Sequence, residues 1–96
     1  MPQYLILAND HTDDDAINRR LAVRQAHLDR MAITKAEGNY IIAGAKLDET
    51  GKMVGSMILI NAESEEAARE WAQNDPYITG NVWATVHIQP FRVANV

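Results

Sequence analysis

The chain contains four short apolar segments and two segments of helical periodicity, one after the first and one after the third apolar segment. Tyr4–Ala8 and the end of Met53–Ile60 are continuous apolar runs, which are typical of strands covered on both faces. Tyr40–Leu47 is a further predicted strand, and Asp48–Gly51 supplies the turn that joins it to Met53–Ile60 as a hairpin. Val82–Val93 alternates, which predicts a fourth strand. One face of this strand is expected to carry Val82, Ala84, Val86 and Ile88, and the other Trp83, Thr85, His87, Gln89 and Phe91.

The first predicted helix starts at Asp13–Asp15 and runs to about Glu37. The acidic residues are candidates for the N-cap and complement the positive end of the helix dipole. Gly38 and Asn39 supply the left-handed stop that ends many helices. Because successive residues advance by about 100°, one apolar arc is predicted, formed by Ile17, Leu21, Leu28, Met31 and Ala32.

Three basic or titratable side chains accompany this apolar arc. Arg24 projects from within it, and Arg20 and His27 lie along its edge. Such groups are rarely buried without partners. The helix is therefore expected to meet the rest of the fold through charged groups that need a partner elsewhere in the chain.

The second predicted helix is capped by Glu63–Glu66. Its last turn leads into Asp75 and Pro76. The residue before a proline is biased out of the helical region, so Asp75 is expected in a turn at the helix exit. The inward face of this helix is formed by Ala67, Ala68, Trp71 and Ala72.

The predicted order of elements is βαββαβ within one domain spanning residues 1–96. In a chain of this size the order favours an α+β ferredoxin-like sandwich with an antiparallel sheet in the strand order 4-1-3-2. The first and third strands are then central, which agrees with their apolar character. Two helices cover only one face of such a sheet, so the second apolar face needs a cover. A homodimer that stacks sheet on sheet is the expected solution.

Composition excludes several classes of protein. The chain has no cysteine, which rules out disulfides, thiolate catalysis and cysteine-ligated zinc or iron–sulfur sites. No apolar run approaches the ~20 residues of a membrane-spanning helix. The N-terminal segment lacks the basic start and cleavage pattern of a signal peptide. We therefore expect a soluble, cytoplasmic protein that does not enter the membrane.

The distribution of charge favours a small anionic ligand. A net charge of −4 argues against binding along a nucleic-acid backbone, which relies on a basic face. A locally positive pocket in an acidic protein suits a small anion better than a polymer. The basic residues nonetheless gather in the first predicted helix, at Arg19, Arg20, Arg24 and Arg30.

Several stretches of the chain resemble the YCII-related (YciI-like) family, and together they span nearly its whole length. The most specific are R-x-x-H-L at Arg24–Leu28 and D-P-Y at Asp75–Tyr77. The others are YLILAND at the start, EGNYIIAGA around the second strand, SEEAAREWAQ before D-P-Y, and HIQPF near the end.

The resemblance implies a dimeric α+β barrel, similar in architecture to muconolactone isomerase, and an active site built on a His-Asp pair. Carried over by motif, the pair is His27 and Asp75. Dechlorination of a ring compound is among the activities associated with the family. The segment Leu47–Met57 is shorter here than in common members and lacks their Pro/Gly-rich insertion. Because such loops shape pockets, no particular substrate is carried over.

A His27–Asp75 pair has two interpretations. A carboxylate on one ring nitrogen fixes the imidazole tautomer and leaves the other nitrogen free for proton transfer near neutral pH. In the structural alternative, the same bond only ties the first helix to the turn after the second, since structural ionic networks also perturb titratable groups.

The other candidate site residues would bind substrate. Arg24 could anchor a carboxylate or phenolate through its planar guanidinium, or form a salt bridge to an internal acid or to a dimer mate. Arg20, one turn earlier, has the same two interpretations, and the salt bridge is favoured for it because the edge of a helix is often solvated. Tyr77 could offer its hydroxyl to an oxyanion or pack in the core. Gly44 and Gly55 could admit a ligand or mark a bulge.

No cofactor or metal is expected. The three histidines show no metal-ligand spacing, and the sequence contains no nucleophile elbow, phosphate-binding glycine loop or dinucleotide fingerprint. The leading hypothesis is a small cofactor-independent enzyme of isomerase, lyase or hydrolytic dehalogenase type. It would act by His-Asp general acid/base catalysis on a small anionic cyclic or aromatic-derived metabolite. The alternative is a non-catalytic dimeric module that binds a small ligand or a partner protein.

Overall fold

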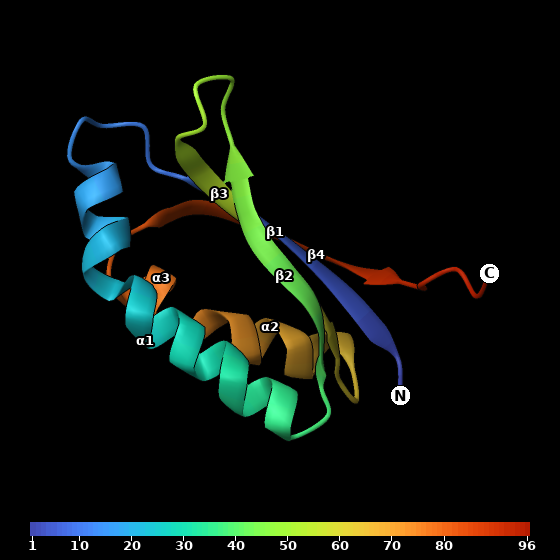
Figure 1. Cartoon of the computed structure of the whole chain (residues 1–96). Helices are drawn as coiled ribbons and strands as arrows, with labels where there is room; N and C mark the ends of the chain where they lie inside the picture. Colours follow the sequence, from blue (N-terminus) through green and yellow to red (C-terminus); the bar gives the residue numbers. More distant parts are fainter.

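A four-stranded antiparallel sheet, with all its helices packed on one face, forms the fold (Figure 1). A computed structural model describes residues 1–96. In chain order the elements are β1 (Gln3–Asp10), α1 (Ala16–Ala36), β2 (Tyr40–Leu47), β3 (Met53–Asn61), α2 (Glu65–Gln73), α3 (Pro76–Thr79) and β4 (Trp83–Phe91).

The strand order across the sheet is β2-β3-β1-β4. It is the predicted 4-1-3-2 order, and the α+β ferredoxin-like fold is confirmed. β1 lies between β3 and β4 and pairs antiparallel with both. Alternate residues of β1 face the helices and are buried, including Ile6 and Ala8, whereas Leu5 and Leu7 face the opposite side. The two strands with the most continuous apolar character are therefore the two central strands.

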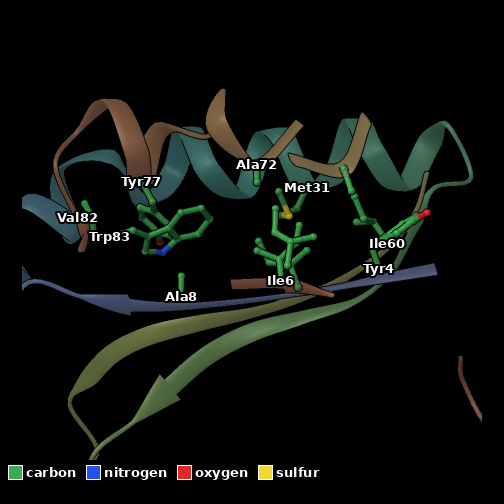
Figure 2. Close-up of a cluster of buried hydrophobic side chains, with 12 residues drawn as sticks. Tyr4, Ile6, Ala8, Met31, Ile60, Ala72, Tyr77, Val82 and Trp83 are labelled. Carbon is green, nitrogen blue, oxygen red and sulfur yellow. The ribbon is translucent and has the colours of Figure 1, made fainter. Parts of the chain in front are cut away.

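The hydrophobic core forms one layer between the helices and the sheet (Figure 2). Its sheet side includes Ile6, Ile58 and Ile60, none more than 2% exposed. Burial of each such side chain contributes about 1.5–3 kcal/mol relative to exposure. Figure 2 shows that Tyr77 and Trp83 lie together at one end of this layer, away from Tyr4 and Ile60.

The predicted apolar arc of α1 is wrong. Only Met31 of that arc is buried, while Leu21 and Leu28 are exposed. The buried face of α1 instead carries Arg20 and His27. The pattern of apolar residues did not reveal this face, because its polar side chains are buried by pairing with carboxylates from other elements. The full set of buried residues in α1 is Ala16, Arg20, His27, Met31 and Thr34.

Trp83 lies on the helix-facing side of the sheet together with Ile88, and not on the opposite face from Ile88 as strict alternation predicted. Asn9 of β1 is opposite Thr85, whereas Asp10 is opposite Trp83, so β4 carries one extra residue between them. The extra residue, Ala84, forms a bulge, and beyond a bulge the side chains exchange faces. The indole of Trp83 is consequently buried in the core.

The helix ends follow the sequence closely, with one addition. Gly38 adopts φ +82° after α1, as the predicted left-handed stop requires. Ser64 caps α2 by accepting a hydrogen bond from the Ala67 amide. Asp15 lies at the N-cap of α1, but its side chain makes no capping hydrogen bond. The addition is the short helix α3, which begins directly after Asp75. No helix in the chain has the length and apolarity needed to cross a bilayer.

Candidate active site

Asp75 is fully buried at the junction between α2 and α3. Its backbone is extended, with ψ 141°, and its side chain accepts a hydrogen bond from the Tyr77 amide at 2.9 Å. Pro76 follows at the first helical position, where its missing N–H is not needed. The D-P-Y sequence thus builds an N-cap that fixes a carboxylate inside the protein.

His27 meets this carboxylate from α1. Its Nδ1 lies 2.9 Å from Oδ1 and 3.0 Å from Oδ2 of Asp75, and the His27 side chain is 8% exposed. Arg30 adds a further contact, with one guanidinium nitrogen 3.2 Å from Asp75 Oδ2. A carboxylate on Nδ1 favours the tautomer in which this nitrogen carries the proton. The second ring nitrogen, Nε2, makes no hydrogen bond within the chain.

Arg20 forms a second buried pair, with Asp10 of β1. One guanidinium nitrogen lies 2.9 Å from each oxygen of the Asp10 carboxylate, and another donates to Ser56 Oγ at 2.9 Å. The Trp83 indole N–H donates to the same hydroxyl at 3.2 Å. Arg20 thus forms the salt bridge to an internal acid that the sequence favoured, although at 2% exposure its edge of the helix is buried, not solvated as expected. Asp10 compensates its charge from the sheet, and only Nε lacks a hydrogen-bond partner.

Tyr77 connects the two pairs. Its ring stacks on the His27 imidazole with centroids 4.1 Å apart, and the Arg20 guanidinium lies 4.5 Å from the ring centroid. Trp83 contacts the same ring edge to face, at 5.6 Å. Burial raises the pKa of the Tyr77 hydroxyl, while the positive charges of Arg20 and Arg24 oppose that shift. The phenol therefore stays protonated at neutral pH. Tyr77 is a core residue, as one of its two interpretations predicted, and it also lines the cleft described next, while its role toward an oxyanion stays a prediction.

A cleft of about 210 Å³ opens between α1 and β2, beside the His27–Asp75 pair. Tyr77 of α3 contributes to its wall. Arg24 also lines it, is exposed, and takes part in none of the ion pairs of the chain. The remaining wall comes from Arg20, His27, Leu28 and Met31 of α1 and from Tyr40, Ala43, Gly44 and Ala45 of β2.

The sequence matches the YCII-related domain over residues 2–92. The chain belongs to the YCII-related family. It is 36% identical over 95 residues to protein YciI of Escherichia coli O6:H1 and to protein YciI of Shigella flexneri, covering 93% of this chain and 95% of each relative. The family resemblance drawn from the R-x-x-H-L and D-P-Y motifs is therefore confirmed.

Solved structures share the fold at low sequence identity. The 5-chloro-2-hydroxyhydroquinone dehydrochlorinase TftG from Burkholderia phenoliruptrix AC1100, solved with 2,5-dihydroxybenzoquinone, matches with a TM-score of 0.82 and 22% identity, covering 96% of this chain and 95% of that chain. Protein Atu4242 from Agrobacterium tumefaciens matches with a TM-score of 0.53 and 12% identity, covering 98% of this chain and 94% of that chain. At these identities the likeness shows the fold alone.

Six of the seven sequence-derived site residues of this YCII-related chain lie in or directly behind the cleft, and Gly55 does not line it. Five of them line it, and Asp75 lies behind His27. Gly44 pairs with Met57 in a regular part of the ladder, on the side of the sheet away from the helices. It therefore marks no bulge, and a Cβ there would meet nothing within 4 Å. Gly55 is the glycine of close approach, because a Cβ would lie 2.4 Å from the Ala8 carbonyl oxygen.

Sequence reasoning missed Tyr40, which lines the cleft from β2. Its place in an apolar run gave no functional signal. Three larger hollows, of about 520, 360 and 230 Å³, lie at the chain ends, beside the β1–α1 loop and between the end of α1 and the start of α2, and none contains the His27–Asp75 pair. His87 contacts Gln89 on the exposed side of β4, and no group of three or more metal-ligating side chains gathers anywhere in the chain.

Proposed function

We propose that this protein is a small enzyme that performs general acid/base chemistry on a small anionic cyclic or aromatic-derived compound. The observation that carries the proposal is the His27 Nδ1–Asp75 bond of 2.9 Å beside a cleft that also holds Arg20 and Arg24. Asp75 orients the imidazole and stabilises its protonated form, and Nε2 is the nitrogen that exchanges a proton. Arg24, with no internal partner, anchors the anionic group of the substrate.

This apparatus suits isomerisation, lyase chemistry or loss of hydrogen halide. In a dehydrochlorination, Nε2 takes a proton from the substrate, the electron pair moves into the ring, and chloride leaves with the electrons of the C–Cl bond. His27 then returns the proton to water. TftG, which shares the fold, is named for this class of reaction and was solved with a quinone. A substituted hydroquinone is therefore the first substrate class to assay.

The test replaces His27 with glutamine and assays turnover of 5-chloro-2-hydroxyhydroquinone and of a panel of hydroxylated and carboxylated ring compounds. We expect a fall in kcat of about 100- to 10,000-fold with ligand affinity retained, because general acid/base catalysis contributes that much. His87→Gln is the matched control, since His87 lies on the exposed side of β4 and should keep wild-type turnover. A His27→Gln variant as fast as wild type would refute the catalytic assignment.

A non-catalytic binding module is the second candidate. The face-to-face stacking of His27 on Tyr77, with little exposure, is what a structural histidine would also show. For such a module, His27→Gln would change affinity for a ligand, and no member of the panel would be turned over by the wild type. The same variant therefore separates the two candidates.

We also propose that the chain works as a homodimer in the cytoplasm. The sheet face opposite the helices carries Leu5, Leu7 and Met57, together with Ile42, which is 53% exposed. Burying such a face against a second sheet is favourable. Sedimentation equilibrium should give twice the chain mass at micromolar concentration, and Leu7→Asp should shift it to the monomer. A wild-type monomer under these conditions would refute the dimer.

A further inference from the structure

The cleft has two chemically different ends. β2 follows α1 through a short turn and runs back beside it (Figure 1). Tyr40, at the start of β2, therefore lies toward the end of the cleft that Met31 lines. Ala45 lies toward the end that Arg24 lines, and His27 comes between the two along α1. One end is thus cationic, and the other presents an apolar side chain and a tyrosine.

The Tyr40 hydroxyl is held in place by the backbone. The register of β2 against β3 shifts between Tyr40 and Ile42. Next to this irregularity, the Ala43 amide donates a hydrogen bond to Tyr40 Oη at 3.0 Å. The bond uses one lone pair of the oxygen and leaves its O–H hydrogen without an acceptor in the chain. A phenol fixed in this way is a neutral donor available to a ligand in the cleft.

The size of the cleft limits what can lie between these ends. Its volume of about 210 Å³ is below the roughly 300–1,000 Å³ of pockets for drug-sized ligands. Along α1, Arg24 and Met31 are seven residues apart, which is about 10 Å at 1.5 Å per residue. A single six-membered ring with one substituent at each end fits this span.

We propose that the cleft recognises a monocyclic compound with two oxygen functions at opposite ends of its ring. An anionic group binds Arg24, and a carbonyl or hydroxyl oxygen accepts the proton of Tyr40. Tyr40 is then a specificity-determining residue, because a ligand with only the anionic group leaves its hydroxyl unpaired. The inference rests on the proposed function, since it describes the ligand of the same cleft, with His27 facing the ring itself.

Binding of benzoate and 4-hydroxybenzoate, measured by NMR titration, tests the proposal. The two probes share the carboxylate and differ only in the para hydroxyl. We expect the wild type to bind 4-hydroxybenzoate about 3- to 10-fold more tightly than benzoate, the worth of one neutral hydrogen bond. Tyr40→Phe should abolish that preference while leaving benzoate affinity unchanged. Arg24→Gln should weaken both probes by about 10-fold or more, because it removes a charged donor.

Tyr40→Phe also removes the acceptor of the Ala43 amide, so the comparison between probes is the decisive readout. A merely structural role would lower both affinities by the same factor, and that result overturns the proposal. Equal affinities in the wild type, or binding of neither probe, overturn it as well. Tyr4→Phe is the matched control, since Tyr4 is buried in the core and does not line the cleft, and it should keep the preference.

The readout is independent of catalysis. If His27→Gln abolishes turnover but the wild type shows no preference between the probes, only the present inference fails. If the preference is present and His27→Gln turns over substrate at the wild-type rate, the inference stands as a property of the cleft and the catalytic assignment fails.

Discussion

Two buried ion pairs join α1 to the rest of the fold, and they differ in what they leave free. Arg20 sends three hydrogen bonds to Asp10 and Ser56. His27 uses one ring nitrogen on Asp75 and keeps the other free beside the cleft. An arginine does not lose its proton in proteins, whereas a histidine does so near neutral pH. The first pair can only hold its partners, whereas we propose that the second also exchanges a proton.

The comparison teaches that a charged residue on the inner face of a helix is not by itself a sign of catalysis. His27 differs from Arg20 because one of its ring nitrogens is bonded to Asp75, the other has no partner in the chain, and the residue lines the cleft. A buried pair of permanent charges, such as Arg20–Asp10, contributes little net stability. Removing one member is nevertheless costly, because the other charge is left buried without a partner. Removing members of the two pairs should therefore have unequal consequences.

The largest effect is expected from Arg20→Ala. Asp10, whose side chain is 5% exposed, would be left as an unpaired buried carboxylate. Breaking a buried pair in this way lowers the free energy of unfolding by about 3–5 kcal/mol. Urea denaturation of the variant and of the wild type measures the difference.

A double replacement sharpens this test. Arg20→Met with Asp10→Leu removes both charges and fills the space with apolar groups, which is often neutral or stabilising for buried pairs. We expect the double variant to be more stable than Arg20→Ala alone. If the double variant and Arg20→Ala unfold at the same urea concentration, the unpaired Asp10 carboxylate is not the cause of the lost stability.

Asp75→Ala should have a smaller effect on stability. It removes the cap of α3 and the acceptor shared by His27 and Arg30, for a loss of about 2–3 kcal/mol in free energy of unfolding. The loss stays below that of Arg20→Ala because a histidine can remain neutral and Arg30, 21% exposed, can turn to water. Asp29→Ala, at an exposed position on α1, is the control and should change stability by less than about 0.5 kcal/mol. An Asp75→Ala variant as unstable as Arg20→Ala would contradict the expected order of effects.

The sequence was sufficient for the fold and for most residues of the candidate site, for identifiable reasons. Continuous apolar runs singled out β1 and β3 as central strands, and Gly38 marked the end of α1. The D-P-Y sequence placed Asp75 at a helix exit. His27 and Asp75 were found because a charged group near an apolar surface needs a partner and because the motifs matched the family, and Arg24 belongs to the same R-x-x-H-L motif as His27.

The sequence was insufficient where long-range contacts decide a side chain's surroundings. The inward face of α1 could not be found by counting apolar residues, since Asp10 lies in another element and compensates Arg20. The side of the sheet on which Trp83 lies depends on a bulge at Ala84, and the local sequence gives no clear signal for that bulge. Tyr40 belongs to the site because β2 lies beside α1, a proximity that no local pattern encodes.

The smallest effect is expected at an exposed pair, Asp13 with Arg19, which extends the comparison to the surface. Two guanidinium nitrogens of Arg19 lie 2.7 and 2.8 Å from the carboxylate oxygens. The hydrogen bond from Arg19 lowers the pKa of Asp13 from 3.8 to about 2. Because the folded pKa is the lower one, the stabilisation is present above pH 3.8 and is lost as the pH falls through about 2.

Asp13→Asn should therefore weaken the dependence of stability on pH between about 4 and 2, the window set by the two pKa values. The change should be small and should shrink further in 1 M salt, because exposed charges are screened. Urea midpoints measured across this window give the slope, and Asp14→Asn, a neighbour that takes part in no ion pair, should leave it unchanged. If Asp13→Asn destabilised the protein more than Asp75→Ala, burial would not be what ranks the three pairs.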